Sequence, residues 1–314
     1  MVLAGGPDRE RPVSLQSGAA VAYALREAGH DVREYDIGPD DLSALKTFEK
    51  WGGDVLFPVL HGRWGEGGGL QLLLDDRELA YVGSRARAAS LCMDKSRAKK
   101  LFLDAGLPTP DWQLLDSTQM PSMHPPIVIK PNNEGSSIDV AICHNPTQVK
   151  QAWRELGRRN SHLLVETFIG GKELTVGVVD RLDAEGGGTF ALPPLQIVPA
   201  ASFYDYEAKY HREDTQYLFD IDLPESLLVE AQRLAIAAHE HAGVNHLCRV
   251  DMIVDADQRI WILEINTLPG FTSHSNVPLA ADHMGEPLHV FVDRLVRLAL
   301  ESSARLNLTA NAGP

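Results

Sequence analysis

Two carboxylates and an amide lie close together in the last third of this sequence, in a pattern that could hold a metal ion. Asp251 lies inside one apolar, strand-like segment, and Glu264 and Asn266 lie at the end of the next. Residues two apart on a strand share a face, so Glu264 and Asn266 are expected to point to the same side. Carboxylate and amide oxygens suit Mg²⁺, which takes its remaining ligands from water and phosphate.

Arg249 stands two residues before Asp251, so it is expected on the same strand face, where it could contact an anion beside the metal. The alternative is that these residues are ordinary charges on a strand face. Charge on an apolar strand is costly unless it is paired or bound to a metal. The common register of Arg249, Asp251, Glu264 and Asn266 therefore favours the metal site.

A lysine followed by a loop of small residues forms a second candidate site, for phosphate. Lys130 ends an apolar segment, and residues 134–137 (Glu-Gly-Ser-Ser) follow it closely. Backbone N–H groups and hydroxyls of such a loop can cover a phosphate while the lysine supplies a point charge, although a plain β-hairpin is an equal alternative. No Walker A motif is present, because Glu173 follows Gly171-Lys172 where a Ser or Thr is required.

Other polar residues carry little signal on their own. Lys95 is by default a charge on a helix, and Glu166 and Glu173 are by default exposed carboxylates. His61 fits a core or capping histidine as well as a ligand contact.

Two histidines late in the chain make a poor metal pair. His239 and His241 are two apart on a predicted helix, so they do not share a face. Both are expected on the solvent side. Glu10 and Ser275 are also ordinary when taken singly, because helix starts and turns favour such residues.

Three units of sequence must position these residues. Residues 1–86 alternate short apolar runs with helical patterns, which predicts a βαβ sheet with ligands beyond the carboxyl ends of its strands. Residues 87–173 predict a small α+β domain. Residues 174–314 carry strands with glycine-rich turns, two helices, and a polar, aromatic loop over residues 202–222 that is expected to be a closing lid.

The expected elements follow from hydrophobic periodicity and from turn residues. In the first unit, strands are expected over residues 1–4, 31–37 and 54–60, and helices from residue 15 to a stop at Gly29 and over residues 70–78. Pro58 favours a strand end or edge. In the other units, helices are expected over residues 94–105, 147–156, 224–242 and 288–300, and strands over residues 127–130, 138–142, 162–168, 249–255 and 260–265.

Composition and charge exclude several classes of protein. The chain has 29 Lys plus Arg against 43 Asp plus Glu, a formal net charge of −14, so it lacks the basic surface of a protein that binds nucleic acid or an anionic membrane. No apolar run approaches the ~20 residues that cross a bilayer, and the chain start has no signal-peptide pattern. Its 3 cysteines are widely spaced, which fits reduced thiols. We expect a cytoplasmic enzyme without nucleic-acid or membrane partners.

Seven short segments, in order along the chain, resemble the motifs of the D-alanine–D-alanine ligases of the ATP-grasp superfamily. They lie at residues 5–18, 60–66, 93–95, 129–137, 204–210, 249–251 and 264–275, and the match runs from about residue 2 to about residue 297. One such segment is weak evidence, but this number in this order is very specific. The resemblance implies a mixed α/β and α+β fold, in which an N-terminal βαβ domain precedes a two-lobed ATP-grasp domain.

The resemblance also implies a nucleotide and metal site between the central and C-terminal units. The residues that would contact ATP are Lys95, Lys130, Glu166, Glu173 and, at the γ-phosphate, Lys209. The residues that would hold two Mg²⁺ (or Mn²⁺) ions are Asp251, Glu264 and Asn266. Asp139 stands where the family commonly has glycine, and a carboxylate near phosphate is unfavourable unless it points away.

A first D-alanine subsite is implied at the N-terminal unit. Glu10 would hold the ammonium of this D-alanine, and His61 would lie near it. Ser136 and Tyr210 would form a hydrogen-bonded group with Glu10 that ties the loop to the N-terminal unit.

A second D-alanine subsite is implied in the C-terminal unit. Arg249 and the backbone of Gly270 would stabilise the tetrahedral oxyanion, and Ser275 would hold the carboxylate of the second D-alanine. Asn276 replaces an apolar residue that the family commonly has next to Ser275, which bears on the choice of acceptor.

The activity implied is ATP-dependent ligation of two D-alanines through a D-alanyl phosphate, with release of ADP and phosphate, for peptidoglycan precursors. The alternatives are a D-alanine–D-lactate ligase, another ATP-grasp carboxylate–amine ligase, or a regulatory nucleotide-binding module without catalysis. Tyr210 argues against the first alternative, because ester-forming relatives tend to lack this tyrosine. The full set of lysine, arginine and carboxylate matches argues against the last. The resemblance also implies a homodimer.

Overall fold

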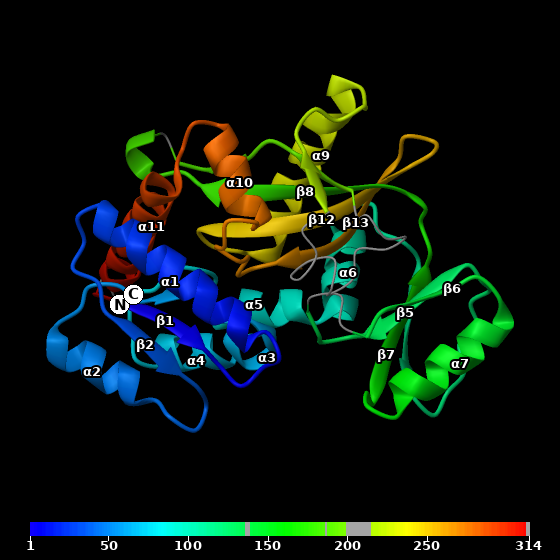
Figure 1. Cartoon of the computed structure of the whole chain (residues 1–314), viewed down its shortest axis with the longest axis horizontal. Coiled ribbons are helices and arrows are strands. Elements are labelled where there is room, and N and C mark those ends of the chain that lie inside the picture. Colours follow the sequence, from blue (N-terminus) through cyan, green and yellow to red (C-terminus); the bar gives the residue numbers. More distant parts are fainter. Residues whose placement is uncertain (136–138, 186, 199–214, 312–314) are drawn as a thin grey trace.

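The computed structural model describes residues 1–135, 139–185, 187–198 and 215–311. Three β-sheets and the helices packed around them make up this part of the chain (Figure 1). Three residues of the predicted site, Ser136, Lys209 and Tyr210, lie outside the described residues, as does the predicted lid up to residue 214.

The first sheet is parallel and, within the described residues, has the strand order β2-β1-β3. β1 (Val2–Gly5) pairs with β2 (Glu34–Ile37) on one side and with β3 (Phe57–Pro58) on the other. The predicted βαβ sheet is therefore confirmed, although β2 and β3 are shorter than predicted. Pro58 ends the edge strand β3, as predicted, because proline has no N–H to donate to a neighbouring strand.

Helices follow these strands and bring two predicted site residues to the carboxyl edge of the sheet. The helices are α1 (Arg11–Glu27), α2 (Ser43–Trp51), α3 (Gly62–Gly65) and α4 (Gly69–Asp75). Glu10 is the residue directly before α1, and His61 is the residue directly before α3. Both therefore lie in the connection from a strand to the following helix, at the edge of a parallel sheet where ligands usually bind.

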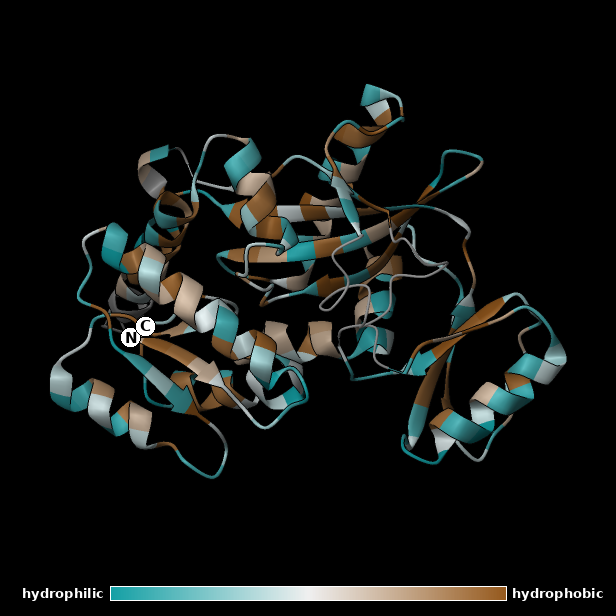
Figure 2. Ribbon diagram, in the orientation of Figure 1, coloured by the Kyte–Doolittle hydropathy of each residue, from teal (hydrophilic) through white to brown (hydrophobic). Residues whose placement is uncertain are grey.

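The middle of the chain forms an antiparallel sheet covered by one amphipathic helix. Its strand order in the described residues is β4-β7-β5-β6. The elements are β4 (Trp112–Asp116), β5 (Ile127–Pro131), β6 (Ala141–Cys143), α7 (Pro146–Gly157) and β7 (His162–Thr167). The predicted order of strand, strand, helix and strand is confirmed, whereas β4 was not predicted. Val149, Trp153 and Leu156 of α7 pack on the sheet, and the outer face of the helix is hydrophilic (Figure 2).

Two helices connect the first sheet to the middle one. They are α5 (Ala86–Met93) and α6 (Lys95–Asp104). Asp94 caps α6, because its Oδ1 accepts a hydrogen bond from the Arg97 N–H at 3.0 Å. This cap fixes the helix start predicted at residue 94 and places Lys95 in the first turn, where its side chain can reach both later sheets.

The third sheet is antiparallel and, within the described residues, has the strand order β11-β10-β8-β12-β13. β9 pairs with residues 178–180 at the end of β8. Its strands are β8 (Gly171–Asp180), β9 (Thr189–Ala191), β10 (Leu195–Val198), β11 (Gln216–Leu218), β12 (Leu247–Asp255) and β13 (Ile260–Asn266). The two late strands predicted to carry the metal site are thus neighbours in the sheet (Figure 1).

Helices cover this sheet and join it to the first one. They are the short 3-10 helix η1 (Asp183–Glu185), and α9 (Glu225–Ala242), α10 (Asn276–His283) and α11 (Leu288–Asn311). α9 covers one face of the sheet through Ala231, Leu234 and Ala238. α11 is longer than predicted and packs against α1, so that Phe291 and Leu295 share one core with Val21. α11 therefore packs in the same core as α1, near the start of the chain.

Candidate functional site

A cavity lies between the middle sheet and the third sheet. Eight of the residues predicted as candidates line it, namely Lys95, Lys130, Glu166, Glu173, Arg249, Asp251, Glu264 and Asn276. Its remaining walls are largely apolar, with Val128, Ile142 and Phe168 from the middle unit and Ile253 and Leu263 from the third sheet. The fold thus brings polar residues from distant parts of the chain to one cleft with apolar walls.

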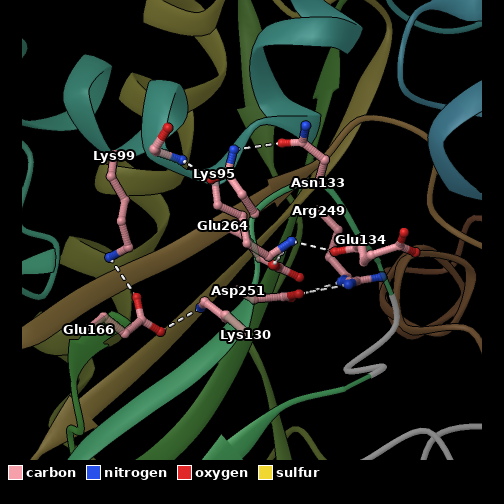
Figure 3. A network of polar contacts seen from close by, with 11 residues as sticks. Lys95, Lys99, Lys130, Asn133, Glu134, Glu166, Arg249, Asp251 and Glu264 are labelled. Carbon is pink, nitrogen blue, oxygen red and sulfur yellow. Dashed lines mark hydrogen bonds and ion pairs between the residues drawn. The ribbon is translucent and has the colours of Figure 1, made fainter. Parts of the chain in front are cut away.

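Glu166 on β7 is buried between two lysines. It is only 3% exposed, with Lys130 Nζ 2.5 Å from its Oε1 and Lys99 Nζ 2.9 Å from its Oε2 (Figure 3). The expectation of an exposed carboxylate is therefore wrong, because the strand faces inward at this position. Although burial by itself raises its pKa, the charges of Lys130 and Lys99 hold the pKa of Glu166 below its ordinary value.

Lys99 was not predicted and is a central member of this group. It is 0% exposed, and its ammonium also donates to Thr109 Oγ1 at 2.7 Å and to the Pro110 carbonyl at 3.2 Å. Burial lowers the pKa of Lys99 to about 8, against the opposing charge of Glu166. One signal was available in the sequence: Lys95 and Lys99 are four apart on α6 and so share a face.

The four residues of the predicted metal site lie together on β12 and β13. In the antiparallel register, Asp251 stands opposite Glu264 and Arg249 stands opposite Asn266. Arg249 donates two hydrogen bonds to Asp251, Nε to Oδ1 at 2.8 Å and the second nitrogen to Oδ2 at 2.6 Å (Figure 3). The prediction that Arg249 and Asp251 share a face is confirmed, and the fork geometry explains the short contacts. Thr175 on β8 donates a further hydrogen bond to Asp251 Oδ1 at 2.8 Å.

The donor set fits a divalent cation that is completed by phosphate. Side chains directly opposite on antiparallel strands have Cβ atoms about 5 Å apart, so the carboxylates of Asp251 and Glu264 can share a hard cation. Within the described ranges, no three His, Cys, Asp or Glu side chains gather as a complete metal site. Asn266 Oδ1 already accepts a hydrogen bond from the Leu268 N–H at 2.9 Å. A metal here would therefore take further ligands from another molecule.

Lys95 connects this carboxylate pair to the loop after β5. Its ammonium lies 3.2 Å from Glu264 Oε2 and donates to the Glu134 carbonyl at 2.6 Å. The loop thus starts beside the carboxylate pair, and β5 and β6 also form the antiparallel pair of a hairpin. Asp139 does not line the cleft, and its carboxylate forms an ion pair with Arg159 at 3.0 Å. Its φ of 59° is a backbone conformation that glycine adopts most easily.

A second polar group lies at the carboxyl edge of the first sheet. Glu10 and His61 are both buried there, and the structure adds Glu66 and Asp8 to them. Glu66 Oε1 accepts a hydrogen bond from the Gly62 N–H at 3.2 Å, and its Oε2 lies 3.6 Å from His61 Nδ1. Glu66 was overlooked although it ends the segment of residues 60–66, and Asp8 has no periodic signal because it lies in a loop.

The turn after β13 meets α1 at the other side of the cleft. A Cβ atom on Gly270 would lie 2.8 Å from Ser275 Oγ, so the backbone approaches this hydroxyl closely only because residue 270 is glycine. Ser17 Oγ on α1 accepts a hydrogen bond from the Phe271 N–H at 3.1 Å. Asn276 begins α10 and is buried at the cavity wall. The predicted residues Gly270, Ser275 and Asn276 are therefore brought together next to the first unit.

His239 does not point to solvent, so that prediction is wrong, whereas His241 is exposed as predicted. His239 is 1% exposed, with Nε2 2.9 Å from Asp180 Oδ1 and Nδ1 3.3 Å from Cys248 Sγ. Asp180 Oδ2 also accepts a hydrogen bond from the His246 N–H at 2.5 Å. The face of α9 toward β8 is thus polar at this point, and hydrophobic periodicity does not reveal a buried polar contact.

Solved structures define the class to which this fold and cleft belong. The D-alanine–D-alanine ligase of Bacillus anthracis in complex with ATP matches with a TM-score of 0.80 and 26% identity, over 97% of this chain and 98% of that one. The D-alanine–D-alanine ligase of Coxiella burnetii matches with a TM-score of 0.79 and 25% identity, over 99% and 96%. Together with the cleft between two lobes, these matches identify a ligase with the ATP-grasp fold.

Sequence comparison narrows the class. A family model described as D-ala D-ala ligase C-terminus matches residues 101–297. The D-alanine–D-alanine ligase of Bordetella petrii is 40% identical over 90% of this chain and 86% of the relative, and that of Bordetella avium is 37% identical over 99% and 96%. The chain belongs to the D-alanine–D-alanine ligase family.

Proposed function

We propose that this chain joins two D-alanine molecules into D-alanyl-D-alanine, with transfer of the γ-phosphoryl group of ATP to the first D-alanine and release of ADP and phosphate, for peptidoglycan precursors. The observation that carries the proposal is the convergence on one cleft of buried lysines, the Arg249–Asp251 pair and Glu264, in a member of this family. A carboxylate is a poor electrophile, so the first D-alanine is activated as an acyl phosphate before the amine of the second attacks it.

ATP would lie in the cleft between the middle and third sheets. The apolar walls suit a flat base, while Lys130 and Lys95 would face its phosphates and Glu173 would contact the nucleotide. Glu166 holds Lys130 in place, because the two groups are in direct contact at 2.5 Å. Lys209, outside the described residues, is proposed for the γ-phosphate on the strength of its motif.

Two Mg²⁺ or Mn²⁺ ions would be held by Asp251, Glu264 and Asn266, and would offset the charge of the phosphates during transfer. The carboxylates have cationic partners in the structure, since Lys95 contacts Glu264 and Arg249 contacts Asp251. The cationic groups of Lys95 and Arg249 therefore already lie where negative charge would develop during the reaction. On binding, the same lysine and arginine would become available to phosphate and substrate.

The amino acids would occupy the side of the cleft next to the first sheet. Glu10 would bind the ammonium of the first D-alanine, near His61, with Ser136 and Tyr210 as partners of Glu10 outside the described residues. Arg249 and the Gly270 N–H would stabilise the tetrahedral oxyanion, and Ser275, beside Asn276, would bind the second carboxylate. The loop over residues 202–222 is proposed to exclude water, because water would hydrolyse an acyl phosphate.

Further expectations follow for the whole protein. Residues 1–86, 87–173 and 174–314 are proposed as the N-terminal domain and the two lobes of the ATP-grasp domain, and we expect a homodimer in the cytoplasm. In the part of the chain that the structure describes, no helix is both long enough and apolar enough to span a bilayer. The negative net charge of −14 argues against nucleic-acid partners.

The test is the release of ADP by the protein with Mg-ATP and D-alanine, compared with L-alanine, with the product identified by mass. Dipeptide formation from D-alanine alone supports the proposal. Product that requires added D-lactate would instead support an ester-forming ligase. Bound ATP without turnover on either substrate would overturn the proposed reaction.

A further inference from the structure

Lys99 is a fully buried lysine that no step of the proposed reaction uses. It is 0% exposed and lies behind the wall of the cleft that Lys130 and Glu166 line. An ammonium has three N–H donors, and three acceptors lie close to Lys99 Nζ. They are Glu166 Oε2 at 2.9 Å, Thr109 Oγ1 at 2.7 Å and the Pro110 carbonyl at 3.2 Å. Lys99 is therefore fully occupied inside the protein and would act on a ligand only through its neighbours.

The Glu166 carboxylate joins Lys99 to the cleft. Its Oε2 contacts Lys99 and its Oε1 lies 2.5 Å from Lys130 Nζ, so the carboxylate lies between the two ammonium groups (Figure 3). Trp112, which stands opposite Glu166 on the neighbouring strand β4, places its ring 5.7 Å from Lys99 Nζ. Because Lys99 holds one oxygen of Glu166, the other oxygen is kept at Lys130.

Lys99 also connects the two walls of the cleft. Its acceptors Thr109 and Pro110 lie in the segment between α6 and β4, which leads into the middle sheet. This segment is attached to the third sheet, because the Ile262 N–H donates to the Pro108 carbonyl at 2.8 Å and Thr109 Oγ1 donates to the Ile262 carbonyl at 2.8 Å. Lys99 thus ties β7 of the middle sheet to a segment that is bound to β13 of the third. A shift of one wall against the other would break one of its contacts.

The charge balance of this buried group favours an anionic ligand. Two lysines share one carboxylate, and burial together with the charge of Lys130 lowers the pKa of Lys99 to about 8, against the opposing charge of Glu166. Apolar side chains of similar volume often stabilise a fold as well as a buried ion pair does, so stability alone does not require a second lysine here. The surplus positive charge is compensated when the phosphates of ATP enter the cleft.

We propose that Lys99 is a positioning residue for ATP binding, which acts through Glu166 to hold Lys130 in the orientation that receives the nucleotide and to fix it relative to the third sheet. This inference rests on the proposed ATP site and deepens it. Lys99 itself touches neither ATP nor D-alanine. Its effect should therefore appear in the affinity for ATP, and it should vanish when Glu166 can no longer transmit it.

The experiment is a double-mutant cycle on the dissociation constant of ATP, measured by calorimetry with Mg²⁺ and without amino acid. Lys99→Met removes the ammonium and keeps the side chain long and unbranched. We expect the dissociation constant to rise about tenfold, as for the loss of a charged hydrogen bond. In the Glu166→Gln background the same change should have less than a twofold effect, because the carboxylate that transmits it is absent. The KM values of the two D-alanines should stay within twofold of wild type.

Lys100→Met is the matched control, because Lys100 follows Lys99 on α6 and has an exposed side chain. It should leave the dissociation constant of ATP unchanged. A value within twofold of wild type in Lys99→Met overturns the role of Lys99. An equal factor in both backgrounds also overturns it, because the effect then does not pass through Glu166. Equal losses of affinity for ATP and D-alanine with a lower melting temperature indicate a structural role and overturn it as well.

The outcomes separate this inference from the proposed function. A wild-type chain that binds ATP but forms no dipeptide overturns the proposed reaction, while the cycle on ATP binding still decides the role of Lys99. A wild-type chain that does not bind ATP overturns both. Should Lys99→Met not fold, Thr109→Val is the second variant. It removes one acceptor of the Lys99 ammonium and keeps the charge, so the dissociation constant of ATP should rise about two- to fivefold, and an unchanged value would overturn the role of Lys99.

Discussion

The two sides of the cleft differ in how their charges are balanced. On the nucleotide side, Glu166 lies between Lys130 and Lys99, and Arg249 forms a two-point contact with Asp251 (Figure 3). On the amino-acid side, Asp8 and Glu66 keep buried oxygens without hydrogen bonds. The charges of the first side are paired with one another, whereas the second side gathers like charges, and burial together with these charges raises the pKa of Asp8. Changes on the two sides should therefore affect different properties.

The largest effect is expected from Arg249→Ala. It removes the proposed oxyanion donor and also the partner of Asp251, so kcat should fall about 10²- to 10³-fold. Steady-state kinetics measure this. Arg259→Ala, an exposed arginine of the β12–β13 turn, is the control and should leave kcat unchanged. A fall of less than threefold in Arg249→Ala would contradict its placement at the reacting carbonyl.

A large loss of stability is expected on the nucleotide side from Glu166→Gln. The change leaves Lys99 and Lys130 without their shared counter-charge inside the protein, and breaking a buried ion pair costs about 3 kcal/mol or more. Urea unfolding gives the free energy of unfolding. Glu155→Gln, on the exposed face of α7, should change it by less than about 0.5 kcal/mol. Equal free energies of unfolding of the two variants would mean that the contacts of Glu166 with Lys99 and Lys130 do not stabilise the fold.

On the amino-acid side, removing a charge is expected to raise the free energy of unfolding rather than lower it. The pKa of Asp8 is raised from its ordinary value of 3.8 to about 6 in the folded protein, so its charge destabilises the fold above pH 6 and has no effect below pH 3.8. Asp8→Asn should therefore raise the free energy of unfolding at pH 7.5. This gain should shrink as the pH falls from about 6 to about 4. A loss of stability at pH 7.5 would contradict the contrast between the two sides.

The smallest effect is expected at the wall of the cleft, from Asn276→Leu. Asn276 lines the cavity beside Ser275, so loss of its amide should raise the KM of the second D-alanine about two- to fivefold through a neutral hydrogen bond. The KM of the first D-alanine should not change, because Glu10 lies on the other unit. A rise confined to the first D-alanine would mean that the two subsites are assigned the wrong way round.

Neighbouring residues were predicted well where one element holds the whole pattern. Alternation along β12 correctly put Arg249 and Asp251 on one face, and the helix predicted from residue 94 matches α6, which Asp94 caps. The parallel first sheet followed from the alternation of strands and helices, and Pro58 correctly marked a strand end. β4 was missed, because its residues are only partly buried and its strand pattern is correspondingly weak.

Contacts between distant elements escaped prediction. Glu166 was taken for an exposed carboxylate and His239 for a solvent-facing residue, yet both are buried against partners from other parts of the chain. Lys99 and Glu66 were not singled out, although helical spacing and a motif contained them. For Glu166, His239 and Lys99 the decisive fact is a polar partner on another element, which local periodicity does not encode. Glu66 differs, because its partners Gly62 and His61 are close to it in the chain.

The sequence by itself determined the family, the order of the elements and the faces on which single strands present their charges, because these depend on local spacing and on motif order. The tertiary structure decided which charged side chains form buried ion pairs and which lie among like charges. Burial and pairing depend on packing among α6, β7 and β12 and on the approach of the loop after β1 to Gly62. The free energy of a charge is set by those surroundings, and only the folded chain brings them together.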